Sequence, residues 1–322
     1  MKQNKLTLIE KMIRMTGMFI LTFGIITSCG TKTSEETTEQ TEEQPTEEAA
    51  SSELFFKISL AEWSLHKAIQ GKEMTNLEFP AKAKELGINA VEYVSTLFDK
   101  DASDMEYLAE LKKVTDDLGV TNVLIMIDNE GDLGDLDEAK RIKAVENHYR
   151  WVDAAKFLGC HSIRVNARGH GDADEVAKAA IDGLSRLAEY GASKQINIIV
   201  ENHGGNSSDG KWLSNVIKSV GNDYCGTLPD FGNFRISEDN NYDRYLGIDE
   251  LMPYAKGVSA KSNNFDEEGN EVVMDYGRIL EIVKKHGYTG YIGIEYEGDA
   301  ISEVDGIIAT KKLLEKEGAK IK

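Results

Sequence analysis

The chain has 322 residues, and its 56 Asp and Glu against 37 Lys and Arg give a formal net charge of −19. A surface this acidic repels the phosphates of nucleic acid, so we exclude DNA and RNA as partners. The length and the hydrophobic content of 41% are sufficient for a large buried core.

The N-terminal segment 1–28 has the pattern of a bacterial export signal. Its apolar run, from about Met15 to Ile26, is too short to span a membrane, and it follows the basic residues Lys2, Lys5, Lys11 and Arg14. The run ends in Ser28-Cys29-Gly30, which is typical of a lipoprotein signal cleaved before a lipidated cysteine. We expect lipidation at Cys29; an ordinary secretory signal with an incidental cysteine is the alternative.

Residues 29–53 consist mainly of Thr, Glu, Gln and Ser. Such a segment cannot bury enough apolar surface to offset the entropy of ordering, so we expect a disordered tether. Residues 54–322 then form the single folded domain, in which we expect Cys160 and Cys225 to be buried thiols. The arrangement predicts a protein of the bacterial cell envelope, periplasmic or on the outer surface, that contacts the membrane through its N-terminal lipid only.

Within residues 54–322, a short apolar run, a polar turn and an amphipathic stretch recur, which is typical of βα units on a parallel sheet. The expected strands are Phe55–Ala61, Ala90–Val94, Asn122–Ile127, Ser162–Asn166, Asn197–Glu201, Gly226–Asp230, Gly257–Lys261 and Tyr291–Glu295. The expected helices are Phe79–Leu86, Asp104–Leu118, Lys140–Leu158, Ala173–Lys194, Trp212–Val220, Asp275–His286 and Glu303–Lys316. Eight such strands predict an α/β fold of the (β/α)8 TIM barrel type. Two polar segments, Asp128–Asp137 and Arg235–Gly247, are long enough to cover the barrel mouth as lids.

The reactive groups of such barrels project from the C-terminal ends of the strands, and these positions are polar here. They hold Glu62, Glu92, Arg164, Asn166, Glu201, Asp230, Ser259, Lys261, Glu295 and Glu297, with Trp63 and His66 after the first strand and His203 after the fifth. A carboxylate at the end of an apolar strand is costly unless it is paired, ligated or solvated. Glu201, Asp230 and Glu295 together predict a cation site; structural ion pairs with Arg164 and Lys261 are the alternative.

Several of these segments resemble the xylose isomerase-like sugar phosphate isomerase/epimerase family. They are Ile58-Ser59-Leu60-Ala61-Glu62-Trp63-Ser64-Leu65-His66, Ala90-Val91-Glu92-Tyr93, Ile163-Arg164-Val165-Asn166, Glu201-Asn202-His203-Gly204-Gly205 and Ile292-Gly293-Ile294-Glu295-Tyr296-Glu297-Gly298. The resemblance implies a divalent metal bound by Glu201, Asp230 and Glu295. Two positions depart from the family pattern, because Ser259 and Asn233 stand where histidines are expected.

The missing histidines change the metal that we expect. Carboxylates with hydroxyl, amide or water ligands suit a hard cation, whereas zinc normally takes imidazole or thiolate. We therefore expect Mn²⁺ or Mg²⁺ as the cofactor, bound more weakly than in relatives that keep the histidine. His203 lies two residues after Glu201 and is the imidazole that could complete the site.

Other residues at the strand ends are candidates for contact with a sugar. Trp63 and His66 could stack on or bind a sugar ring, and Glu92, Arg164, Asn166 and His203 complete the expected substrate-binding set. Lys261 is a candidate for activating a substrate oxygen. Core packing for Trp63, ion pairs for Arg164 and Lys261, and a turn-capping role for His203 are the alternatives.

Three functions follow from these residues. By resemblance, Glu201 and Glu295 carry a proton to and from a carbon beside a carbonyl, as in a sugar isomerase or epimerase that passes through a metal-stabilised enediolate. The same proton abstraction from a 3-keto-glycoside makes a lyase or hydratase, which the export signal favours because phosphorylated sugars are cytoplasmic. A sugar-binding lipoprotein without catalysis is the third. In each case the partner is a small sugar or keto-glycoside.

Overall fold

The computed structural model of the chain describes residues 53–321. The predicted signal peptide, the lipidated Cys29 and the predicted tether up to residue 52 lie outside the described residues. The described residues belong to one compact unit. None of their helices is both long enough and apolar enough to cross a membrane.

Eight parallel strands form one sheet in the order β6-β5-β4-β3-β2-β1-β10-β9. All eight were expected from the sequence, with ends that differ by at most two residues. They are β1 (Lys57–Ala61), β2 (Ala90–Val94), β3 (Thr121–Met126), β4 (Ser162–Val165), β5 (Asn197–Glu201), β6 (Cys225–Leu228), β9 (Val258–Ser262) and β10 (Tyr291–Tyr296).

The sheet closes between its two outer strands, β6 and β9. Isolated parallel bridges join Thr227 to Ala255 and Asp230 to Ser259. At the second bridge the Ser259 N–H donates to the carbonyl of Pro229 at 2.9 Å, and the Phe231 N–H donates to the carbonyl of Ser259 at 3.0 Å. The predicted (β/α)8 barrel is therefore confirmed, and this seam places Asp230 beside Ser259.

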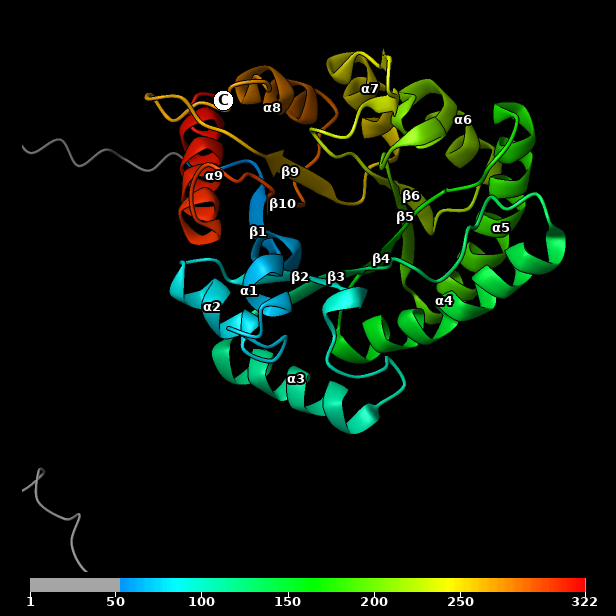
Figure 1. The fold of residues 1–322 in the computed structure, drawn as a ribbon, viewed down its shortest axis with the longest axis horizontal. Coiled ribbons are helices and arrows are strands. Elements are labelled where there is room, and N and C mark those ends of the chain that lie inside the picture. The colour runs from blue at the N-terminus through cyan, green and yellow to red at the C-terminus, as the bar shows by residue number, and fades with distance from the viewer. Residues whose placement is uncertain (1–52, 322) are drawn as a thin grey trace, which may run out of the picture. The chain divides into compact units, whose positions relative to one another are not determined.

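The helices lie outside the strands and surround them (Figure 1). They are α1 (His66–Gln70), α2 (Phe79–Glu85), α3 (Met105–Leu118), α4 (Glu138–Leu158), α5 (Ala173–Lys194), α6 (Gly210–Val220), α7 (Arg244–Leu251), α8 (Tyr276–Lys285) and α9 (Glu303–Gly318). An aspartate N-cap begins α3, α4, α5, α6, α7 and α8, because its carboxylate accepts the free N–H groups of the first turn. The expected helices agree with the observed ones to within two residues at either end.

The structure differs from the sequence-based expectation after β6. The segment Arg235–Gly247, predicted as a lid, contains a short antiparallel hairpin of β7 (Arg235–Ser237) and β8 (Asn240–Asn241) and the first half of α7. The octapeptide of α7, RYLGIDEL, lacks a clear apolar stripe and has Gly247 at its centre, so the aspartate N-cap Asp243 is its main helical signal. The glycine is required by packing, since a Cβ atom there would lie 2.2 Å from the Phe234 ring.

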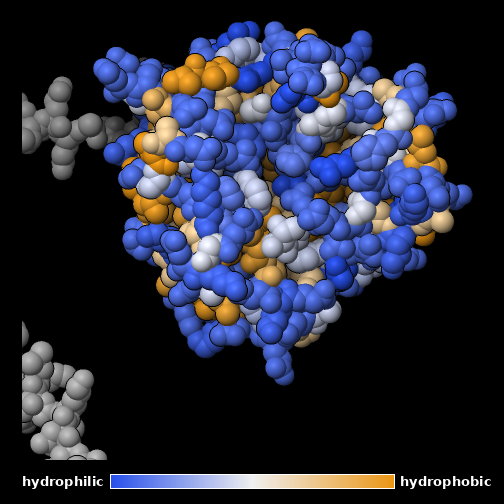
Figure 2. Space-filling view, in the orientation of Figure 1, coloured by the Kyte–Doolittle hydropathy of each residue, from blue (hydrophilic) through white to orange (hydrophobic). Residues whose placement is uncertain are grey.

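The core is a continuous cluster of apolar side chains between strands and helices, and both cysteines, Cys160 and Cys225, are free and buried in it, as expected. Figure 2 shows a mainly hydrophilic outer surface, with apolar side chains visible in the hollow near the middle of the view. The polar residues inside the barrel are concentrated near the C-terminal ends of the strands. The fold thus surrounds a small polar volume with an apolar wall.

Candidate active site

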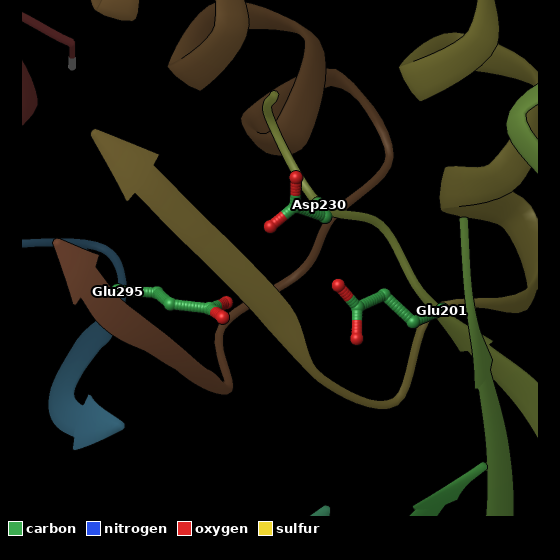
Figure 3. A group of neighbouring side chains, drawn as sticks. All are labelled: Glu201, Asp230 and Glu295. Atoms are coloured by element: carbon green, nitrogen blue, oxygen red, sulfur yellow. The ribbon is translucent and has the colours of Figure 1, made fainter. Parts of the chain in front are cut away.

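Three carboxylates meet near the C-terminal ends of the strands. Glu201 is the last residue of β5, Asp230 follows β6, and Glu295 lies in β10. All three are buried, and one oxygen of each lies within 4.8 Å of the others. Figure 3 shows their carboxyl groups turned towards a common centre. Oxygens at this spacing can each lie at the distance of about 2.0–2.6 Å that Mg²⁺, Mn²⁺ or Ca²⁺ requires from its ligands.

The two positions where histidines were expected do lie at these carboxylates. The Ser259 hydroxyl is 2.8 Å from Asp230 Oδ2 and 2.7 Å from Glu295 Oε2. The Asn233 amide donates to Glu201 Oε1 at 3.0 Å, and its N–H donates to Asp230 Oδ1 at 2.8 Å. Because a hydroxyl has one proton, Ser259 can donate to only one of its two carboxylates at a time.

Two buried cations lie beside the three carboxylates. Arg164 forms ion pairs with Glu201 at 2.8 Å and with Asp128 at 2.9 Å. Lys261 is 3.1 Å from Glu297 and also lies within 4 Å of Glu295 and Asp230. The ion pairs given as the alternative to a metal site therefore exist.

These ion pairs leave negative charge in excess. Two cations face five carboxylates, namely Asp128, Glu201, Asp230, Glu295 and Glu297. Glu201 Oε2 is buried and has Arg164 Nε at 2.8 Å as its charged neighbour, so this carboxylate is compensated only by a guanidinium that it shares with Asp128. An uncompensated buried anion is costly, so the residues present fit a divalent cation, and a set made only of oxygen donors suits Mg²⁺ or Mn²⁺ better than zinc.

The environment separates the acidities of the three carboxyl groups. Burial raises the pKa of Glu201 and that of Asp230 to about 7 in each case, against the opposing effects of Arg164 and Lys261. Burial acts on Glu295 too, but the Lys261 ammonium and the Ser259 hydroxyl outweigh it and hold the pKa of Glu295 below its ordinary value. Near neutral pH, Glu295 is therefore ionised and can act as a proton acceptor, whereas Glu201 and Asp230 are each partly protonated.

Glu92, expected to bind substrate, lies inside the barrel on β2. The Ser59 hydroxyl donates to its Oε1 at 2.5 Å, and its buried Oε2 has no hydrogen-bond partner. The neighbouring Gly293 leaves room for it, since a Cβ atom there would lie 2.5 Å from the Glu92 carboxylate. Burial raises the pKa of Glu92 to about 8. The side chain is therefore a neutral acid at neutral pH.

Trp63 and His66, also expected to bind substrate, lie just after β1. Their rings stack at 4.5 Å with an interplanar angle of 10°. His66 Nδ1 is 2.6 Å from the Trp63 carbonyl and 3.5 Å from a carboxylate oxygen of Glu303 in α9. One face of the Trp63 ring is thus covered by His66, and the substrate contact of this pair stays a prediction.

The remaining expected contacts, Arg164, Asn166 and His203, share a neighbour that the sequence analysis did not single out. Asp128 Oδ1 accepts hydrogen bonds from Arg164 Nη1 and from Asn166 Nδ2, both at 2.9 Å. Asp128 lies two residues after β3 and so carries the same signal as Glu201, a carboxylate at the end of an apolar run. It was instead assigned to the start of a lid.

His203 follows the end of β5, and its Nδ1 is buried without a hydrogen-bond partner. Burial, with Arg164 and Lys261 nearby, lowers the pKa of the imidazole. The backbone of His203 and Gly204 is fixed by the hydroxyls of Ser207 and Ser208, each at 3.0 Å. The imidazole therefore does not cap its own turn, and its buried Nδ1 has no hydrogen-bond partner among the described residues.

A model of the family described as "Xylose isomerase-like TIM barrel" matches residues 80–317. The chain belongs to this family. The family is enzymatic, and the match spans every strand from β2 to β10, including those that carry the three carboxylates.

Three relatives show what this xylose isomerase-like chain is similar to. The 3-keto-D-glucoside 4-epimerase of E. coli has a TM-score of 0.62 and 16% identity, over 82% of this chain and 100% of that one. A xylose isomerase-like TIM barrel protein of Mycobacterium smegmatis in complex with magnesium has a TM-score of 0.60 and 17% identity, over 76% and 88%. The C-glycoside deglycosidase alpha subunit of Arthrobacter globiformis is 42% identical over 66 residues, which is 20% of this chain and 19% of that protein.

The three carboxylates predict a measurable affinity for Mn²⁺ or Mg²⁺. We expect Asp230→Asn to weaken Mn²⁺ binding by at least about tenfold, because it removes one anionic ligand from a site that contains no imidazole. Calorimetric titration of chelator-treated protein measures this. Asp249→Asn is the control, since Asp249 pairs with Lys285 and His286 on the outer helices. Equal affinities of wild type and Asp230→Asn would rule out this site.

Glu92 predicts a pH-dependent stability. Its pKa is about 8 in the folded chain and has an ordinary value of 4.5, so the folded state holds a proton that the unfolded state releases. This contribution is complete below about pH 4.5 and is lost as the pH rises towards 8, by up to about 1.4 kcal/mol per pH unit. Glu92→Gln keeps the shape without the charge. Its free energy of unfolding should match that of wild type at pH 5 and exceed it at pH 8.

Urea unfolding at a series of pH values tests the Glu92 prediction. Glu281→Gln, at an exposed position of α8, is the control and should follow wild type throughout. A constant difference between wild type and Glu92→Gln from pH 5 to pH 8 would show that Glu92 is ionised in the folded protein over that range.

Proposed function

We propose that this protein is a metal-dependent sugar isomerase or epimerase that moves a proton on a carbon beside a carbonyl group. The observation that supports it best is the meeting of Glu201, Asp230 and Glu295 within 4.8 Å, with Lys261 and Arg164 alongside. Such a site can bind the carbonyl oxygen and the adjacent hydroxyl oxygen of a ketose or aldose. It then places carboxylates beside the carbon that loses and regains the proton.

The metal would be held by Glu201, Asp230 and Glu295, and when bound it supplies positive charge to the substrate's carbonyl oxygen and adjacent hydroxyl. The chain's own residues do the rest. Glu295, whose pKa is lowered, takes the proton from carbon. The electron pair of the broken C–H bond forms a carbon–carbon double bond, and the π pair of the carbonyl group moves to its oxygen. Lys261 donates a hydrogen bond to the enediolate that results, and Glu201 returns a proton. Return to the opposite face of the same carbon gives an epimer, and return to the neighbouring carbon gives an isomer.

A lyase or hydratase acting on 3-keto-glycosides is the second candidate. The short match to a C-glycoside deglycosidase subunit and the fold shared with a 3-keto-D-glucoside 4-epimerase favour it. The first step is the same removal of a proton beside the ketone. The electron pair of the C–H bond then forms a carbon–carbon double bond, and the aglycone leaves with the electrons of its bond to the sugar and is protonated.

The partner in either reaction is a small sugar or keto-glycoside. We further propose that the enzyme acts in the bacterial cell envelope, anchored through lipidated Cys29, because the first 28 residues have the pattern of a lipoprotein signal. That location favours keto-glycosides and free sugars over phosphorylated ones.

The proton-transfer mechanism predicts a large loss of turnover in Glu295→Gln and Glu201→Gln. We expect kcat to fall by about 10²–10⁴-fold in each, because the amide cannot accept or return the proton. The reaction is followed on a panel of free, phosphorylated and 3-keto sugars in deuterated water. An epimerase leaves the sugar intact with deuterium on the reacting carbon, whereas a lyase releases the aglycone.

Glu281→Gln is the control for turnover, since its side chain is exposed on α8. Full activity of both Glu295→Gln and Glu201→Gln on an identified substrate would refute the mechanism. Wild-type protein that turns over none of the sugars, and binds them equally well with and without a chelator, would indicate a binding protein instead.

The lipid anchor predicts the fate of the Cys29→Ser variant. Wild-type protein expressed in a bacterium should sediment with membranes and incorporate labelled fatty acid. The variant should do neither, because its thiol is absent. Membrane association that persists in Cys29→Ser would show that the anchor is elsewhere.

A further inference from the structure

A cavity opens between the loops that follow β4 and β5. It has a volume of about 310 Å³, which is at the lower end for small-molecule pockets. Its walls carry Arg168, His170 and His203, together with the backbone of Gly169 and of the Gly204-Gly205 turn. These walls are basic or neutral, in a chain whose net charge is −19.

The positive charge of this cavity has little compensation. Arg168 forms no ion pair and no side-chain hydrogen bond with any described residue. His170 lies 3.5 Å from a carboxylate oxygen of Asp132. The nearby Asp128 is already paired with Arg164 and Asn166. A guanidinium presents two parallel N–H donors that match a carboxylate or phosphate, and Arg168 has both to offer.

The loop that carries Arg168 is held by close backbone packing. The Gly134 N–H donates to the Arg168 carbonyl at 2.7 Å. A Cβ atom on Gly169 would lie only 2.1 Å from the Gly134 carbonyl oxygen. Since no side chain fits at residue 169, the two loops approach more closely than other residues would allow. Arg168 therefore starts from a fixed backbone position, which lowers the entropy lost when its side chain binds a ligand.

The opposite wall is connected to the carboxylates. His203 follows Glu201 by two residues, and its unpartnered Nδ1 belongs to a side chain that lines the cavity. The Ser208 hydroxyl fixes the Gly204 N–H and donates to the carbonyl of Asn233 at 2.8 Å. Asn233 in turn donates to Glu201. His203 also lies close enough to Glu295 for their charges to interact, so we infer that a ligand group in this cavity can belong to a sugar bound at the carboxylates.

We propose that this cavity is a subsite for an oxyanion carried by the sugar substrate, which accepts hydrogen bonds from the Arg168 guanidinium and from the imidazole N–H of His203. The proposal rests on the proposed function and narrows its substrate class to acidic sugars. A carboxylate, as in a uronic acid, is favoured over a phosphate by the same argument that places the enzyme in the cell envelope.

Calorimetry with the full chain tests the subsite, using D-glucose, D-glucuronate and D-glucose 6-phosphate as probes in one buffer. We expect wild type to bind glucuronate at least about tenfold more tightly than glucose, because Arg168 adds a charge-assisted pair of hydrogen bonds. Arg168→Gln should abolish that difference, because it removes the guanidinium that pairs with the carboxylate. If wild type binds glucose 6-phosphate, and not glucuronate, more tightly than glucose, the oxyanion is a phosphate.

Lys178→Gln is the matched control, because it removes one positive charge at an exposed position of α5. It should keep the preference for glucuronate. If Arg168→Gln still prefers glucuronate, the carboxylate binds elsewhere, at the metal for example, and the subsite is refuted. Equal binding of all three probes by wild type would also refute it. The proposed function would fail in a different experiment, in which wild-type protein turns over none of the sugars. The subsite would fail as a lost preference for glucuronate over glucose.

Discussion

The structure depends on one unfavourable arrangement, the burial of more carboxylates than cations inside the barrel. Glu201, Asp230 and Glu295 lie in a small volume that the apolar wall shields from water. Burying like charges is costly unless partners compensate them. Arg164 and Lys261 compensate for part of this charge. The hydroxyl of Ser259 and the amide of Asn233 also donate hydrogen bonds to the carboxylates. The remaining negative charge is what gives the site its affinity for a cation and its capacity to move protons.

The closure of the barrel and the assembly of this site are the same event. The strands β6 and β9 are joined by isolated bridges, one of which pairs Asp230 with Ser259. These bridges close the sheet, and the second one keeps Asp230 beside the Ser259 hydroxyl, which also contacts Glu295 on β10. The free energy lost by burying the carboxylates is therefore offset by the burial of apolar surface in the surrounding core, which is complete only when the sheet closes.

The replacement of imidazole by hydroxyl and amide has a chemical consequence. Both Ser259 and Asn233 lie where the family resemblance leads one to expect histidine, and both contact the carboxylates directly. The result is a site of oxygen donors, in which hard cations are favoured and transition metals lose their preferred ligand. The imidazole of His203 lines the neighbouring cavity, where we propose that it contacts the substrate.

The sequence by itself determined the strands, most of the helices and the residues at the strand ends, because apolar periodicity and aspartate caps are local signals. Glu201, Asp230, Glu295 and the two replaced histidines could all be named from it. Helix α7 could not, since its eight residues lack an apolar stripe and it forms through packing against Phe234. Tertiary structure alone decided that Asp128 pairs with Arg164, that His66 covers Trp63, and that Arg168 and His203 face one cavity. These contacts join residues on different loops, and the distance between loops is set by close backbone packing such as that of Gly134 with Gly169, which leaves no periodic trace in the sequence.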